Sequence, residues 1–285
     1  MIDLHIHTTA SDGTDSPAEV VRKARTLGLH AIAITDHDTT RGVAEAQQTA
    51  AGSDLQVIPG IEISTGFYDT QDHVTDVHVL GYFVNPAAES LDSMLNWMLQ
   101  ERDVRNRKLA AALTACGWPM DLEAMKAEHP DSTFGRMFFA RALLERGAVS
   151  SIAEAFDRFI GPGGCCYVPK TPFPFAQAMA VIRDAGGLPV LAHPYQYGFP
   201  ETVLERFIRE GRDAGAAGLE VYYSLYSPAQ QQALLALAAR FGLVPTGGSD
   251  YHGTNKPHIQ PGTGQGDLYV PDEILTGLEA LLHTL

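Results

Sequence analysis

The sequence has few cysteines, few basic residues and no long apolar run, and each shortage excludes a class of protein. Three cysteines among 285 residues make no disulfide framework. No run reaches the ~18 apolar residues of a membrane span. With 20 basic and 34 acidic residues the net charge is −14, so we expect no stable binding of duplex nucleic acid. The first residues do not resemble a signal peptide, and we expect a cytoplasmic protein.

The three cysteines are Cys116 and the adjacent pair Cys165 and Cys166. Adjacent cysteines do not match the spacing of zinc fingers. We therefore expect reduced thiols without a function of their own.

Short apolar runs alternate with helical patterns along most of the chain. The helical patterns have clear starts, such as the capping box Ser16-Pro17-Ala18-Glu19 and the pair Ser227-Pro228. The apolar runs show little polar alternation, which is typical of buried parallel strands. They cover residues 2–6, 31–35, 55–63, 77–83, 188–192, 218–222 and 243–247. This alternation predicts an α/β fold, either a barrel or a doubly wound sheet.

One segment interrupts the alternation. Residues 100–167 read as several helices without a strand and end at the loop signal Gly161-Pro162-Gly163-Gly164. We expect a helical insertion there, with the barrel formed by residues 1–99 and 168–285. Residues 100–170 carry ten basic and nine acidic side chains, whereas the rest of the chain is strongly acidic. The insertion is either a surface that binds an anion or an ordinary solvated helical face.

Nine side chains that can bind metals stand at or near the ends of the apolar runs. They are His5, His7, Asp12, His37, Glu62, His78, His193, Asp250 and His252. His5 and His7 share one face of a strand because strand side chains alternate. In a barrel the carboxyl ends of the strands meet at one face, so these residues should converge. The other histidines, in turns or helices, are expected at the surface: His30, His73, His129, His258 and His283.

Mixed imidazole and carboxylate ligands favour Mn²⁺, Zn²⁺ or Fe²⁺ over Mg²⁺ or Ca²⁺. Nine ligand groups are too many for one ion. We therefore expect two or three divalent ions, with Mn²⁺ the first choice and Zn²⁺ or Fe²⁺ as alternatives.

The ordered set of motifs resembles the polymerase and histidinol phosphatase (PHP) domain of the amidohydrolase superfamily. The resemblance spans everything except the insertion and implies a distorted (β/α)7 barrel. It further implies one metal held by His5, His7, Glu62 and Asp250. A second metal would share Glu62 and take His78 and His193. A third would take Asp12, His37 and His252.

The length and the insertion after the fourth run are similar to those of PHP-type 3′,5′-nucleoside bisphosphate phosphatases. This resemblance implies removal of the 3′-phosphate from adenosine 3′,5′-bisphosphate by a hydroxide that bridges two metals. The alternatives are a histidinol-phosphate phosphatase, an exonuclease on short oligoribonucleotides, or a non-catalytic metal-binding module. Glu62, Asp250 and His193 are the expected catalytic residues. Asp36 and Asp38 either orient metal-bound histidines or cap the following helix.

A 3′,5′-bisphosphate needs cations for its second phosphate. Arg136, at an expected helix start after Thr133-Phe134-Gly135, and Lys170 are the first candidates. Arg105 and Arg107 are the next. Tyr195, Tyr197 and Phe199 either stack on a base or pack on the insertion. Asn255 is a further polar candidate.

Overall fold

The computed structural model describes residues 1–71, 73–128 and 134–284. His129 and Thr133 lie outside these ranges. The described chain divides into two compact units, one made of Met1–Leu95 with Pro172–Leu285 and the other of Asn96–Thr171. Each unit is described here by itself. None of the described helices combines the length and the apolar character needed to cross a bilayer.

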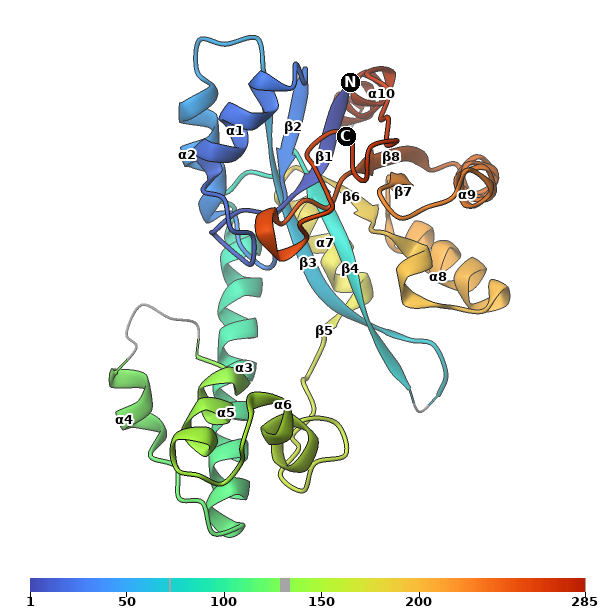
Figure 1. Ribbon diagram of the computed structural model, residues 1–285. Helices are drawn as coiled ribbons and strands as arrows, with labels where there is room; N and C mark the ends of the chain where they lie inside the picture. The colour runs from blue at the N-terminus through green and yellow to red at the C-terminus, as the bar shows by residue number, and fades with distance from the viewer. Residues whose placement is uncertain (72, 129–133, 285) are drawn as a thin grey trace. The chain divides into compact units, whose positions relative to one another are not determined.

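The first unit contains a sheet that closes almost completely into a barrel (Figure 1). Its strands follow the order β1-β2-β3-β4-β6-β7-β8, and the short β5 pairs with β3. Their bounds are β1 Ile2–Ile6, β2 Ala31–Ile34, β3 Gln56–Tyr68, β4 Val74–Tyr82, β5 Phe173–Pro174, β6 Leu188–Leu191, β7 Gly218–Tyr223 and β8 Val244–Gly248. Residues that follow β8 complete the ring, because the Asp250 amide donates to the His5 carbonyl and the His7 amide donates to the Tyr251 carbonyl.

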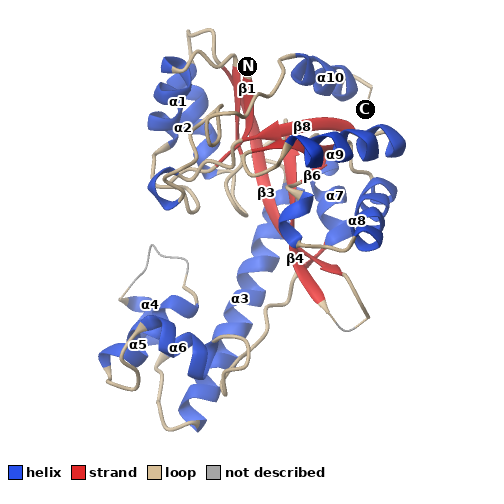
Figure 2. Cartoon of the chain, turned by 45° about the vertical axis from the view of Figure 1, so that its right-hand side comes forward, coloured by secondary structure: helices blue, strands red, loops and turns tan. Residues whose placement is uncertain are grey.

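Helices cover the outside of this sheet (Figure 2). They are α1 Pro17–Thr26, α2 Arg41–Ala50, α7 Phe175–Asp184, α8 Glu201–Ala214, α9 Pro228–Phe241 and α10 Glu273–Leu282. The capping box at Ser16 is present, and Ser227 forms another with Gln230, so both predicted helix starts are confirmed. The glycine-rich residues 262–266 form turns, as predicted.

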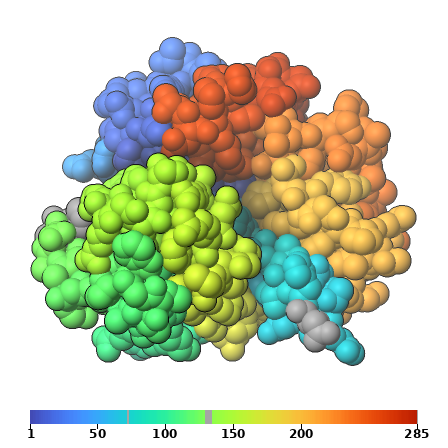
Figure 3. Space-filling model, turned by 60° about the horizontal axis from the view of Figure 1, so that its bottom comes forward, coloured from blue at the N-terminus to red at the C-terminus, as the bar shows by residue number. Residues whose placement is uncertain are grey.

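The fourth strand corrects the expectation of an all-parallel sheet. β4 runs antiparallel to both β3 and β6, while the other neighbours on the path pair in parallel. Only residues 69–73 connect β3 to β4, and a parallel pair needs a crossover of a dozen or more residues. In the space-filling view the cyan end of this hairpin lies at the surface beside α8 (Figure 3). There Arg206 of α8 donates to the carbonyls of Tyr68 and Asp69.

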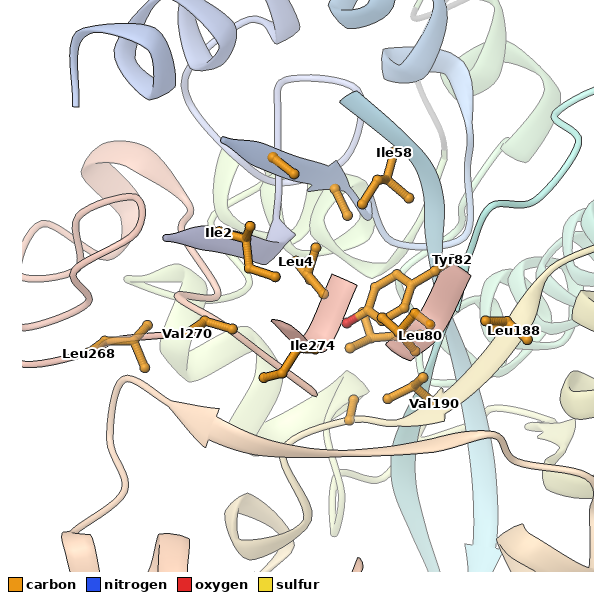
Figure 4. Packing of buried hydrophobic residues seen from close by; sticks show 14 residues of the cluster. Ile2, Leu4, Ile58, Leu80, Tyr82, Leu188, Val190, Leu268, Val270 and Ile274 are labelled. Atoms are coloured by element: carbon orange, nitrogen blue, oxygen red, sulfur yellow. The ribbon is translucent and has the colours of Figure 1, made fainter. Parts of the chain in front are cut away.

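Apolar side chains fill the barrel at one end. Ile2, Ile58, Leu80 and Tyr82 pack there with side chains of β6 and α10 (Figure 4). These residues lie near the amino ends of the parallel strands and near the carboxyl end of antiparallel β4. The opposite end of each strand is therefore left for polar side chains.

The second unit is helical, as predicted. It contains most of the long helix α3 Glu89–Ala115, which begins in the first unit, together with α4 Leu122–Ala127, α5 Arg136–Glu145, α6 Ile152–Ala155 and a single π-helical turn at Phe156–Ile160. The unit has an apolar core of its own, built around Leu113, Phe139, Leu143 and Ile160.

Candidate metal centre

His5 and His7 begin the site at the carboxyl end of β1. Both side chains are fully buried, and their Nε2 atoms lie 3.1 Å apart. The strand places the two rings on one side, since side chains alternate in direction with a period of two. Two imidazoles at this distance in a buried position suit the ligation of a shared cation.

Glu62 on β3 occupies the middle of a ring of histidines. Its Oε2 lies 3.3 Å from His5 Nε2 and 3.1 Å from His7 Nε2. The same oxygen lies 3.1 Å from His37 Nδ1. The other carboxylate oxygen, Oε1, lies 3.0 Å from both His78 Nδ1 and His193 Nε2. A fully buried carboxylate in contact with five histidines is able to bind a cation.

Asp250 follows β8 and faces the first pair of histidines. Its Oδ1 lies 3.6 Å from His5 Nε2 and 3.4 Å from His7 Nε2. Its Oδ2 accepts hydrogen bonds of 2.6 Å from the Tyr223 hydroxyl and the Lys256 ammonium. One oxygen is therefore left for a cation while the other is held by protein groups.

Asp12 forms a more open group with His7, His37 and His252. Its Oδ1 lies 3.5 Å from His7 Nδ1 and 3.3 Å from His252 Nε2, while its Oδ2 is 4.0 Å from His37 Nε2. The Asp12 side chain is 53% exposed, in contrast to the buried Glu62. Asn255 donates to the Asp12 carbonyl at 2.7 Å and so holds this loop in place.

His78 and His193 reach the centre by different routes. His78 lies in the middle of β4, opposite Ser64, and not at a carboxyl end, because β4 is antiparallel. His193 follows β6 with a backbone φ of 21°, which is rare outside glycine. Asp38 and Asp250 also have positive φ. Strained backbone of this kind is often found at functional sites, where surrounding contacts hold it.

The donor set fits divalent cations. Among the described residues, His7 Nδ1, His193 Nδ1, His37 Nδ1 and Glu62 Oε2 are buried and form no hydrogen bond, although the last two atoms lie 3.1 Å apart. Buried polar atoms are normally satisfied, so unpaired ones call for an ion or a water. All nine ligand candidates from the sequence meet in overlapping groups at this end of the barrel.

Comparison with known proteins agrees with this geometry. The PHP domain family matches residues 3–112. A 3′,5′-nucleoside bisphosphate phosphatase of Chromobacterium violaceum is 34% identical over 252 residues, which cover 88% of this chain and 87% of that protein.

The chain belongs to the PHP family.

Two further similar proteins span most of the chain. The 5′-3′ exoribonuclease Rnm of Escherichia coli K12 is also 34% identical over 252 residues, covering 88% of this chain and 84% of that protein. The crystal structure of a Bifidobacterium adolescentis protein, described as a candidate metal-dependent phosphoesterase, has 31% identity and a TM-score of 0.70. Its alignment covers 98% of this chain and 95% of that one.

The pKa values of the histidines in the metal centre depend on burial and on the neighbouring carboxylates. Burial opposes the charge of His5, but Glu220, Glu62 and Asp250 outweigh burial and raise its pKa well above the usual value. The pKa of His7 is raised to about 9, since Asp250 and Glu62 outweigh burial. Burial lowers the pKa of His37 to about 3. A bound divalent ion would replace the protons of His5 and His7.

Burial opposes the charges of the carboxylates as well, but the neighbouring histidines outweigh it. His37, His78 and His5 hold the pKa of Glu62 well below its usual value. His5 and His7 do the same for Asp250. Both groups are therefore carboxylates at neutral pH, the form that binds a cation.

Glu220 on β7 belongs to the PHP centre and was not expected from the sequence. It is fully buried, lies 2.9 Å from His5 Nδ1 and accepts the His193 backbone N–H at 2.7 Å. By accepting from Nδ1, it leaves His5 Nε2 free to bind a metal. The available signal was a single carboxylate inside the apolar run at residues 218–222.

Asp36 takes neither of its two expected roles. Its carboxylate accepts from the Thr8 amide and hydroxyl and from the Ser11 hydroxyl, so it holds the loop before Asp12. Asp38 accepts the Ser64 amide at 2.8 Å and thereby ties its loop to β3. The following helix α2 has no side-chain cap.

Two of the proposed substrate aromatics have structural contacts. The Tyr197 hydroxyl accepts the His78 amide and donates to the Ala192 carbonyl, and its ring packs against Phe199 and Phe207. Tyr197 therefore braces β4 and β6. The Tyr195 ring is half-buried against Tyr226.

The proposed cationic residues lie in the second unit. Arg136 is the first residue of α5, as predicted, and its guanidinium lies over the Phe156 ring. Burial and the nearby guanidinium groups of Arg136 and Arg102 lower the pKa of Arg105. Lys170 is exposed in a loop, and Arg107 pairs with Asp103 at 2.8 Å. Arg102, Arg105 and Arg136 therefore lie close enough to influence one another electrostatically.

Proposed function

We propose that this chain is a metal-dependent phosphatase that removes the 3′-phosphate from nucleoside 3′,5′-bisphosphates. Adenosine 3′,5′-bisphosphate would yield AMP and phosphate. The observation that carries the proposal is Glu62, a buried carboxylate within 3.3 Å of a nitrogen of each of five histidines. The C. violaceum relative, which carries this name, supports the choice of substrate.

Two or three divalent ions would occupy the centre, with Mn²⁺ proposed first and Zn²⁺ or Fe²⁺ as alternatives. His5, His7, Glu62 and Asp250 would hold one ion, and Glu62 would share a second with His78 and His193. Asp12, His37 and His252 would hold a third. When bound, such ions neutralise phosphate charge and lower the pKa of a water for attack.

The protein groups around the ligands have positioning tasks. Tyr223 and Lys256 hold one oxygen of Asp250, which keeps the other directed toward His5 and His7. Glu220 fixes the ring of His5 and the backbone of His193 together. Phosphoryl transfer depends mainly on positioning and on charge neutralisation, so this rigidity is the contribution of the barrel.

The second phosphate requires cations of another kind. We propose that Arg136 and Lys170 supply them, because residues 100–170 carry ten of the 20 basic residues of an otherwise acidic chain. Tyr195 is the proposed stacking surface for the base, and Asn255 acts through the loop that carries Asp12.

A second candidate is the exonucleolytic trimming of short oligoribonucleotides. It is favoured by the E. coli relative, an exoribonuclease with the same identity and share of this chain as the phosphatase. The two activities would use the same centre, and they differ in what lies beyond the reacting phosphate.

A substrate panel separates these activities. Phosphate release is measured from adenosine 3′,5′-bisphosphate, 3′-AMP, AMP and histidinol phosphate, and nucleotide release from a short 5′-phosphorylated RNA. The bisphosphate should give the highest kcat/KM, and chelator should abolish turnover. A higher kcat/KM for the RNA would favour the exonuclease, and no metal-dependent turnover of any substrate would contradict both.

A further inference from the structure

All three cysteines of the chain meet in the second unit. Cys166 Sγ lies 3.1 Å from Cys116 Sγ and 3.7 Å from Cys165 Sγ. The three sulfur atoms lie within 4.8 Å of one another. Cys116 is 50 residues away from Cys166 along the chain, so the fold and not the local sequence brings them together.

Local backbone structure fixes the positions of the thiols. Cys116 directly follows the end of α3, where its amide donates to the Ala112 carbonyl. The amides of Cys165 and Cys166 donate to the carbonyls of Arg158 and Phe159. The turn before this pair needs glycine, because a Cβ on Gly164 would lie 2.5 Å from the Phe159 backbone.

Packing alone does not account for this cluster. Cys166 is buried in the apolar core of the unit, as a small apolar side chain would be. Cys116 and Cys165, however, are exposed and gain little from contact with sulfur. The three thiols of the chain lie close enough together to bind one cation.

We propose that Cys116, Cys165 and Cys166 form a thiolate site for a thiophilic d¹⁰ cation, with Zn²⁺ as the reference ion and water as the fourth ligand. Zn–S bonds of about 2.3 Å place thiolates of a tetrahedral site about 3.8 Å apart. The Cys165–Cys166 distance of 3.7 Å is close to this value, and Cys116 would move outward by about 0.7 Å from its present 3.1 Å contact. No histidine or carboxylate of the described residues joins the group.

This site is chemically distinct from the histidine and carboxylate centre of the barrel. Thiolates select soft ions, whereas imidazole with carboxylate accepts harder ions such as Mn²⁺. A cation in the cluster would tie the end of α3 to the segment after the π-helical turn. Its expected effect is to stabilise the second unit.

Cobalt titration of the full-length protein tests the proposal. Metal-free, reduced protein is titrated anaerobically with Co²⁺, and absorption is followed in the near-ultraviolet, where thiolate-to-cobalt charge transfer appears. The expected result is one equivalent of thiolate-bound Co²⁺ that Zn²⁺ displaces. Glu62→Gln should keep this band, because its change lies in the other unit.

Substitution of the two exposed cysteines tests whether their thiols bind the cation. Cys116→Ser and Cys165→Ser should fold as the wild type by circular dichroism and lose the charge-transfer band. Zn²⁺ should slow labelling of the wild-type thiols at least tenfold and leave labelling of Cys116→Ser unchanged. Absence of the band in the wild type, or its persistence in Cys116→Ser, would overturn the proposal. If the reduced protein gives no cobalt band and exposure of the metal-free protein to air oxidises Cys116 and Cys166 to a disulfide, a redox pair replaces the metal site.

Discussion

Replacing Glu220 by glutamine tests whether a buried carboxylate outside the ligand set controls metal binding. Glu220 accepts two hydrogen bonds, one from the His5 ring at 2.9 Å and one from the His193 amide at 2.7 Å. Glutamine has nearly the same shape, but it carries one acceptor oxygen and one amide nitrogen. Both N–H groups cannot be satisfied, so either the His5 ring or the His193 backbone loses its acceptor.

The size of the effect follows from that lost contact. A hydrogen bond to a charged group contributes about 1.5–3 kcal/mol, and about 1.4 kcal/mol corresponds to a factor of ten. We therefore expect Glu220→Gln to weaken metal binding by roughly 10- to 100-fold, the range typical of residues that orient metal ligands. Activity should recover in part at high metal concentration, because every ligand is still present.

The assay is a chelator competition that gives the metal dissociation constant of each variant, together with kcat/KM as a function of metal concentration. Asp3→Asn is the matched control. Asp3 is an equally buried carboxylate, but it accepts the backbone amides of His5, Ser249 and Gly262 rather than a histidine ring nitrogen. It should lower thermal stability with little change in metal affinity. Unchanged metal affinity in Glu220→Gln would refute the positioning role.

Three other outcomes are expected. Glu62→Gln should abolish turnover and lower the bound metal, because one buried charge serves two proposed ions; full metal content with near-normal activity would contradict bridging. In a chelator titration the wild type should first lose the ion of the third site, because the Asp12 side chain is 53% exposed. Asp12→Asn should lack this ion and keep the others. Simultaneous loss of all ions from the wild type would contradict a separable third site. Arg136→Ala and Lys170→Ala should each lower kcat/KM for adenosine 3′,5′-bisphosphate by about one to two decades and spare 3′-AMP, as expected for one charge-assisted contact; equal losses on both substrates would indicate damage to the fold.

The convergence of several ligand candidates was predictable because strand geometry is regular. His5 and His7 share a face through the period of a strand, and apolar runs mark the strands that end in Glu62 and Asp250. The direction of β4 was not predictable from its own residues, since an apolar run has the same composition in either direction. The apolar runs at 55–63 and 77–83 leave 13 residues between them, which is long enough for a crossover. In the structure both strands extend into this stretch and leave only residues 69–73 as the connection.

Side-chain partners were the least predictable part. Glu220 stands within an apolar run and resembles any strand residue until the neighbouring strands place His5 beside it. The meeting of Cys116 with Cys166 depends on the packing of a helix end against a loop 50 residues later. Such contacts are set by tertiary structure, and no local pattern encodes them.

The closure of the barrel has a consequence for how the protein is made. The segment after β8 supplies both the hydrogen bonds to β1 and the ligand candidates Asp250 and His252. Their partners His5 and His7, at the carboxyl end of β1, are synthesised well before them. Contacts of such long range form late, and domains fold as units. Until the last strand arrives, the early histidines have no complete metal site, so the nascent chain should gain metal affinity and protease resistance together, in one step after the segment that follows β8 has been synthesised.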